Sequence, residues 1–147
     1  MTHEFSEFFA SDLSRQEKAR RIAEIIVRER GYPWIGLYDV LPDTINLIDC
    51  NGELPVYPVY PRHKGLNGRA VVNKSVVMVN DTLNDADYLT TFGKTKSELI
   101  IPVLSGKGEV IGTIDGESHS KNAFNDSDIK FLSEFAQRVT ELWALQL

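Results

Sequence analysis

The chain has 147 residues, 42% apolar and 25% charged, a balance typical of one soluble globular domain with its own core. The net charge of -5 argues against general nucleic-acid binding, and the basic residues from Arg15 to Arg21 suit a solvated helix face. The N-terminus lacks a signal-peptide pattern and the apolar runs are shorter than the ~20 residues that span a bilayer, so we expect a cytoplasmic protein without membrane contacts.

Residues 15–30 carry the first strong helical pattern. Ser14 and Glu17 have the spacing of a capping box, and Gly31 fits the position after the last turn. Apolar residues at helical spacing predict one buried face, formed by Ala19, Ile22, Ala23 and Ile26. Upstream, three phenylalanines between positions 5 and 9 are too apolar for water. We therefore expect a short helix there that packs on the domain or on a partner subunit.

The middle of the chain predicts strands and irregular segments. Two strands are expected at 34–40 and 44–50, joined by a Leu-Pro-Asp turn. The proline-rich segment 51–64 is expected to be an edge strand or irregular, with Tyr57 and Tyr60 as candidates to line a cavity. A glycine-flanked turn at 65–68 precedes a short helix around 69–73, and 76–79 predicts a third strand. The long polar loop 80–96 contains Tyr88 and Phe92, and loops of this length usually serve a function.

Residues 97–118 predict a hairpin in which apolar runs at 99–104 and 110–114 flank a Ser-Gly-Lys-Gly turn. Glu98 stands at the entry of the first strand, and Asp115 and Glu117 at the exit of the second. Antiparallel pairing places the start of one strand beside the end of the next, so three carboxylates meet at one end of the hairpin. This cluster suits a pocket for a cationic group, while the alternative is that the acids face solvent.

The last helical pattern begins after Asn125, a favourable N-cap, and places Asp128 in the first turn. We expect one continuous helix, with an apolar stripe formed by Ile129, Leu132, Phe135, Ala136, Val139 and Trp143. The order of elements is helix, two strands, short helix, three strands and helix. This order predicts an α+β domain with a mostly antiparallel sheet.

Six segments in the same order resemble those of a GAF domain, a small-molecule-binding and sensing module. They are WIGLYDV, GLNGRAV, VVMVNDT, TKSELIIPV, GEVIGTIDGES and AFNDSDIKFLSEFA. The resemblance implies a single domain over residues 1–147, with a helical region at 1–30 and the sheet, pocket and last helix at 34–147. It further implies a central sheet of five to six strands, with the N- and C-terminal helices packed on one face and a ligand pocket under loops on the other.

Within that superfamily the chain is most similar to the free methionine-R-sulfoxide reductases. Their pattern has one cysteine before the glycine-rich turn, one within it and one in the following long loop. By spacing, Tyr57, Asn67 and Thr91 occupy these three positions here, and Cys50 matches none of them. The resemblance therefore implies that the thiol chemistry is lost, and Cys50 is expected to be a small packed residue of its strand.

The acids of the reductase pattern are retained. Ser97-Glu98-Leu99 matches Ser-Glu-Ile, and residues 114–118 match Leu-Asp-Ile-Asp-Ser with Glu117 in place of the second aspartate. In the reductases, the corresponding carboxylates hold the amino group of a free amino acid. The resemblance implies a ligand site made of Glu98, Asp115 and Glu117, with walls and lid from Tyr57, Tyr60, Asn67, Tyr88, Thr91 and Phe92.

Three functional hypotheses follow. The first is a non-catalytic protein that binds or senses a small polar molecule, such as an amino acid or another amine. The second is a diverged reductase that uses Cys50 with an external thiol. The third is an interaction module without a ligand, suggested by Phe5, Phe8 and Phe9. GAF domains commonly dimerise through their terminal helices, so a homodimer is expected. The spacing of the histidines and the cysteine matches no metal site, and neither a metal nor a cofactor is expected.

Overall fold

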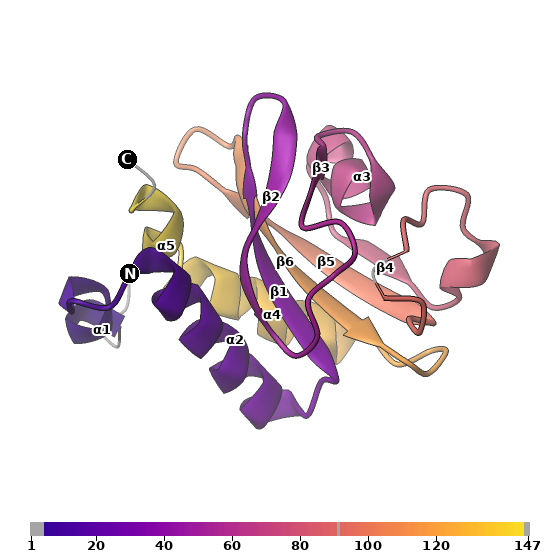
Figure 1. Cartoon of the computed structure of the whole chain (residues 1–147), viewed down its shortest axis with the longest axis horizontal. Helices are drawn as coiled ribbons and strands as arrows, with labels where there is room; N and C mark the ends of the chain where they lie inside the picture. Colours follow the sequence, from indigo (N-terminus) through magenta and orange to yellow (C-terminus); the bar gives the residue numbers. More distant parts are fainter. Residues whose placement is uncertain (1–4, 91, 146–147) are drawn as a thin grey trace.

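The computed structural model describes residues 5–90 and 92–145. One antiparallel sheet of six strands forms its centre, in the spatial order β3-β2-β1-β6-β5-β4 (Figure 1). The strands are β1 (Trp34–Val40), β2 (Thr44–Asn51), β3 (Val59–Pro61), β4 (Val77–Val79), β5 (Ser97–Leu104) and β6 (Val110–Ser118). The helices are α1 (Ser6–Ala10), α2 (Arg15–Arg30), α3 (Gly65–Asn73), α4 (Asp126–Arg138) and α5 (Glu141–Ala144), with a 3-10 turn, η2 (Thr82–Asn84). The expected α+β fold with a mostly antiparallel sheet is confirmed.

Both faces of the sheet are buried, because helices cover one face and α3 with its neighbouring loops covers the other (Figure 1). In β1, Ile35 and Leu37 point to the face covered by α2 and α4. Trp34 and Tyr38 alternate with them and point to the opposite face, beneath the loops. The same alternation in β5 and β6 decides which of their acids lie inside the molecule.

Helix α2 has the boundaries that its sequence predicts. The side chain of Ser14 accepts from the backbone N–H of Glu17, the capping box is complete, and Gly31 closes the helix with a φ of 73°. The expected solvated basic face is wrong in part. The Nζ of Lys18 is buried and donates to the carbonyl of Phe9, and Arg20 donates to the buried carboxylate of Asp49 over 2.9 Å.

The N-terminal phenylalanines pack within their own chain. Phe5 and Phe9 are buried, and the ring of Phe5 lies 5.9 Å from that of Phe135 in α4. Phe8 is partly buried against the same cluster. Of the two expectations for this segment, the structure therefore supports packing on the domain itself.

Three boundaries differ from the sequence-based expectation. Helix α3 begins at Gly65, because the expected glycine turn is already helical, and β6 continues to Ser118. The last helix is interrupted after Arg138, where the hydroxyl of Thr140 donates back to the carbonyl of Ala136 and the short α5 follows. Among the described residues, none of the helices is long and apolar enough to cross a membrane.

Candidate functional site

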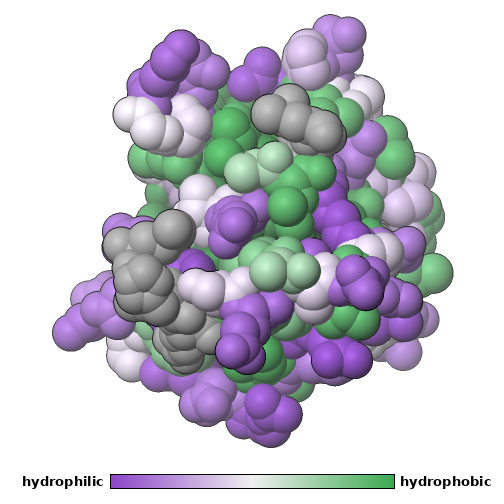
Figure 2. All heavy atoms as spheres, turned by 90° about the vertical axis from the view of Figure 1, so that its left-hand side faces the viewer, coloured by the Kyte–Doolittle hydropathy of each residue, from purple (hydrophilic) through white to green (hydrophobic). Residues whose placement is uncertain are grey.

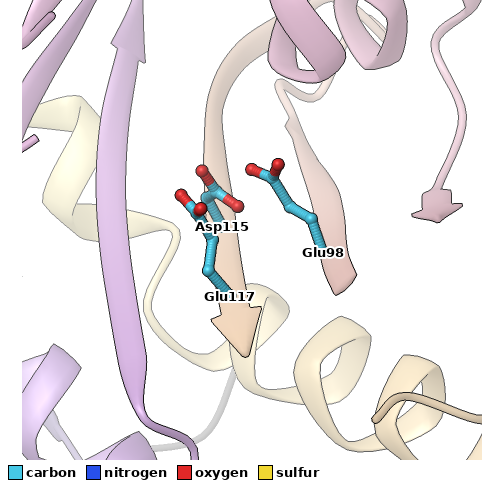
Figure 3. A group of neighbouring side chains, drawn as sticks. All are labelled: Glu98, Asp115 and Glu117. Carbon is cyan, nitrogen blue, oxygen red and sulfur yellow. The ribbon is translucent and has the colours of Figure 1, made fainter. Parts of the chain in front are cut away.

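Three carboxylates meet on the face of β5 and β6 that points away from α2 and α4. Glu98 lies directly opposite Glu117 in the strand pairing, and Asp115 lies opposite Ile100, two residues along the same face. Oxygen atoms of the three carboxylates lie within 4.8 Å of one another. Figure 3 shows Glu98 on one strand pointing towards Asp115 and Glu117 on the other. The side chains are 4%, 1% and 0% exposed, so the alternative that these acids face solvent is wrong.

Hydrogen-bond donors from separate parts of the chain hold this cluster, the acid triad. Asn67, in the first turn of α3, donates from Nδ2 to Oδ2 of Asp115 over 3.3 Å and to the hydroxyl of Tyr60 over 2.6 Å. Its own Oδ1 accepts from the hydroxyl of Thr113 over 2.7 Å. Thr95, in the long loop, donates to Oε1 of Glu117 over 2.5 Å. The triad is therefore positioned by α3, by β6 and by the long loop together.

Burial makes the acid triad difficult to ionise. Burial, followed by the charges of Asp115 and Glu117, raises the pKa of Glu98 well above its usual range. Burial also raises the pKa of Asp115 to about 6, although hydrogen bonds from Glu98 and Asn67 oppose the shift. Among the described residues, Oδ1 of Asp115 is a buried atom without a hydrogen-bond partner. A cation bound at this point would relieve the cost of holding several carboxylates out of water.

A small, partly open cavity lies over Glu98 and Asp115. Its volume is about 20 Å³, enough for about one water molecule. The wall consists of Tyr38, Pro55, Tyr57, Tyr60, Gly65, Leu66, Asn67, Leu89, Thr90, Glu98 and Asp115. Within this described wall there is no lysine, arginine or histidine, so the acids face no compensating positive side chain.

The loop from Asp85 to Thr90, which we call the lid, closes one side of the cavity. Leu89 and Thr90 line the cavity, and Leu89 lies so close to Gly65 that a Cβ at Gly65 would sit 3.2 Å from it. Arg69 of α3 binds both carboxylate oxygens of Asp85, over 2.9 and 3.1 Å. This two-point ion pair ties the lid to α3.

The expected pocket residues divide into two groups. Tyr60 and Asn67 contact the triad region, and Tyr57 lines the cavity from an exposed position. Tyr88 packs instead against the apolar cluster of α3 and β4, and Phe92 packs on Trp34 at 5.8 Å, so neither lines the cavity. Position 91 lies outside the described residues.

Sequence reasoning missed Tyr38, Thr95 and Thr113, and also the wall residues Pro55, Gly65, Leu66, Leu89 and Thr90. Tyr38 lines the cavity, while the two threonines hold the triad through hydrogen bonds. The alternation of side chains along a strand could have indicated Thr113, because Thr113 shares a face with Asp115. The same alternation along β1 could have indicated Tyr38. No local pattern indicated Thr95, because it reaches Glu117 from an irregular loop.

Cys50 lies outside the cavity wall and has the character of a packed residue. Its sulfur is buried in β2 beside the cluster of Trp34 and Tyr38. Burial raises the pKa of the thiol to about 11, which keeps it protonated and a poor nucleophile near neutral pH. Cys50 is the only cysteine of the 147-residue sequence.

The fold and the sequence together define the class of protein. Residues 12–143 match the model of the GAF domain family, so this chain belongs to the GAF domain family. In particular, the chain resembles the free methionine-R-sulfoxide reductase of Saccharomyces cerevisiae, with 30% identity over 78 residues. That match covers 53% of this chain and 43% of the relative, so it spans less than half of the yeast protein.

Two further relatives match over more of their length. Protein YtsP of Bacillus subtilis is 28% identical over 112 residues, which cover 76% of this chain and 68% of the relative. The solved structure of the type II free methionine-R-sulfoxide reductase from Thermoplasma acidophilum superposes with a TM-score of 0.82. It is 29% identical, and the superposition covers 88% of this chain and 95% of the other.

Proposed function

We propose that this GAF protein binds or senses a small molecule through that molecule's ammonium group, without transforming it chemically. The observation that carries the proposal is the acid triad, three buried carboxylates of which Glu98 and Asp115 line a cavity whose described wall holds no basic side chain. A primary ammonium offers one positive charge and three donors, which suits a cluster of carboxylate acceptors. The similarity to reductases that act on a free amino acid makes amino acids, including methionine sulfoxide, the first ligands to test.

The proposal of binding without reaction rests on the single thiol. Cys50 lies outside the cavity wall, and its raised pKa disfavours the thiolate that attack on a sulfoxide requires. By spacing along the sequence, Tyr57, Asn67 and Thr91 are expected at the thiol positions of the reductase pattern. In the presence of dithiothreitol, methionine sulfoxide is therefore expected to be reduced no faster with the protein than in buffer alone.

Calorimetry at pH 8 tests the binding part. The ligands are free methionine sulfoxide, methionine and a simple primary amine, each paired with its N-acetylated form, which lacks the ammonium. We expect saturable heat from at least one free amine and none from its acetylated partner. Glu98→Gln is expected to weaken the binding about tenfold or more, whereas Glu109→Gln, at an exposed position in the β5–β6 turn, leaves it unchanged. Equal heats from free and acetylated ligands would overturn the proposal.

A further inference from the structure

We propose that the acid triad also binds a hard divalent cation, of the Ca²⁺, Mg²⁺ or Mn²⁺ class, when no amine is bound. This inference rests on the proposed function in one respect only: both proposals assign a ligand to the same three carboxylates. One oxygen from each of Glu98, Asp115 and Glu117 lies within 4.8 Å of the others. Three oxygens no more than 4.8 Å apart each lie within about 2.8 Å of a common centre, which is close to the calcium–oxygen distance of about 2.3–2.6 Å. A small inward movement therefore lets all three bind one ion.

An unpartnered oxygen points to a missing ligand at this centre. Asp115 is 1% exposed and its Oδ2 accepts from Asn67, whereas its Oδ1 lacks a partner among the described residues. A buried carboxylate oxygen without a donor is costly, and native structures normally supply a donor, a water or an ion. Figure 3 shows the carboxylates of Glu98 and Asp115 turned towards each other across the gap between their strands.

The small volume of the cavity favours a metal ion over an organic molecule in this conformation. A volume of about 20 Å³ holds about one water molecule or one metal ion. A ligand with several heavy atoms needs the lid, or the loop that carries Pro55 and Tyr57, to move first. A metal ion is small enough for the cavity as it stands, so this conformation suits the ion and a widened pocket suits the amine.

The ligand atoms define the class of metal. The triad offers only carboxylate oxygens, and its described neighbours Asn67, Thr95 and Thr113 carry oxygen and amide groups. Hard oxygen ligands favour calcium, magnesium and manganese, while zinc sites in proteins usually include histidine or cysteine. Because the ion and an ammonium need the same carboxylates, each should displace the other.

Calorimetry on protein treated with EDTA and then dialysed tests the inference. CaCl₂, MgCl₂ and MnCl₂ are titrated at pH 7.5, and we expect a dissociation constant below about 1 mM for at least one of them. Glu98→Gln and Asp115→Asn, two variants of nearly unchanged shape, are each expected to weaken binding about tenfold or more. Glu109→Gln is the matched control and keeps the wild-type value. Circular dichroism first establishes that each variant is folded.

The outcomes separate the two proposals. The cation inference is overturned if none of the three salts gives saturable heat at 10 mM, or if folded Glu98→Gln and Asp115→Asn bind the ion as wild type does. Protein that takes up an amine but no metal overturns the cation inference alone. Protein that takes up a metal but no amine overturns the proposed function alone. Release of bound Mn²⁺ by an added amine, followed by electron paramagnetic resonance, supports a shared site.

Discussion

Glu98 of β5 and Glu117 of β6 form a directly opposed pair in the antiparallel sheet, and both side chains are buried. Acidic residues in directly opposite positions normally destabilise a sheet, and burial adds the cost of desolvation. A pair of this kind persists where a cation compensates for it or where function requires it. Under the proposed function, the acid triad is therefore a place where stability and ligand binding oppose each other.

The first prediction follows from that opposition. Glu98→Gln removes an ionisable carboxyl group whose pKa is raised in the folded state, at nearly constant shape. The unfolded glutamate ionises freely at pH 8 whereas the buried one does not, so we expect the ligand-free variant to be more stable by about 1 kcal/mol at that pH. Urea unfolding followed by circular dichroism measures the change. The same variant loses ligand binding, as described above. Glu109→Gln should change the stability by less than about 0.5 kcal/mol, because it is exposed. A destabilised Glu98→Gln would mean that the charge of Glu98 is compensated within the protein.

The second prediction concerns the lid. Arg69 holds Asp85 by two hydrogen bonds and contacts Asp87 at 3.2 Å, with 29% of the arginine side chain exposed. A partly exposed ion pair contributes about 1 kcal/mol at most, so Arg69→Gln should open the lid only about three- to fivefold more often. Hydrogen–deuterium exchange of residues 85–90 should rise by that factor. Arg28→Gln, at an exposed position of α2, is the control and leaves the exchange unchanged.

The third prediction concerns Trp34, whose ring packs beside the triad. Trp34 lies opposite Glu117 in the β1–β6 pairing, and its ring folds over Gly36. A Cβ at Gly36 would sit 2.3 Å from the ring, so Gly36→Ala must displace the indole and break its 2.8 Å hydrogen bond to the carbonyl of Glu53. We expect a loss of about 2–3 kcal/mol and a red shift of tryptophan fluorescence. Gly106→Ala, with open space around it, should change neither.

The fourth prediction concerns pH and the start of α4. Burial raises the pKa of Asp128, but hydrogen bonds from Tyr32 and Arg30 outweigh it and leave the pKa below its ordinary value. A lowered pKa in the folded state stabilises the protein above the ordinary aspartate pKa. This contribution disappears as the pH falls through the lowered value.

Asp128→Asn tests this link. Between pH 6 and pH 3, wild type should lose about 1 kcal/mol more unfolding free energy than the variant, because only wild type contains the group that takes up the proton. The distances that support this are 2.6 Å from the hydroxyl of Tyr32 and 2.7 Å from the guanidinium of Arg30. Parallel pH profiles for the two proteins would contradict the assignment.

The fifth prediction is the homodimer. Figure 2 shows hydrophobic surface between hydrophilic side chains on the side of the molecule where α1 and α5 lie. Leu145, which is 38% exposed, follows α5. Phe8 of α1 is only partly buried. We expect light scattering at tens of micromolar to give twice the 16.6 kDa chain mass, and Phe8→Glu to shift it towards one chain. A wild-type mass of one chain would remove this expectation.

Local signals were sufficient where the neighbours in sequence supply the contacts. Ser14, Glu17 and Gly31 bound α2 as predicted, since capping groups act within one turn. The hairpin of β5 and β6 was also predictable, because a short turn sets which strands pair. Since β6 extends to Ser118, Asp115 and Glu117 lie within the strand rather than beyond its end.

The sequence by itself determined the α+β order of elements, the capped helices and the meeting of three acids at one end of a hairpin. Only the tertiary structure decided that these acids are buried, because burial depends on α3 and the long loop, which cover them, and on β1, which lies beside them in the sheet. It alone brought Thr95 to the triad and turned Tyr88 and Phe92 away from the cavity. Those contacts join segments far apart in the chain, and no local periodicity encodes them.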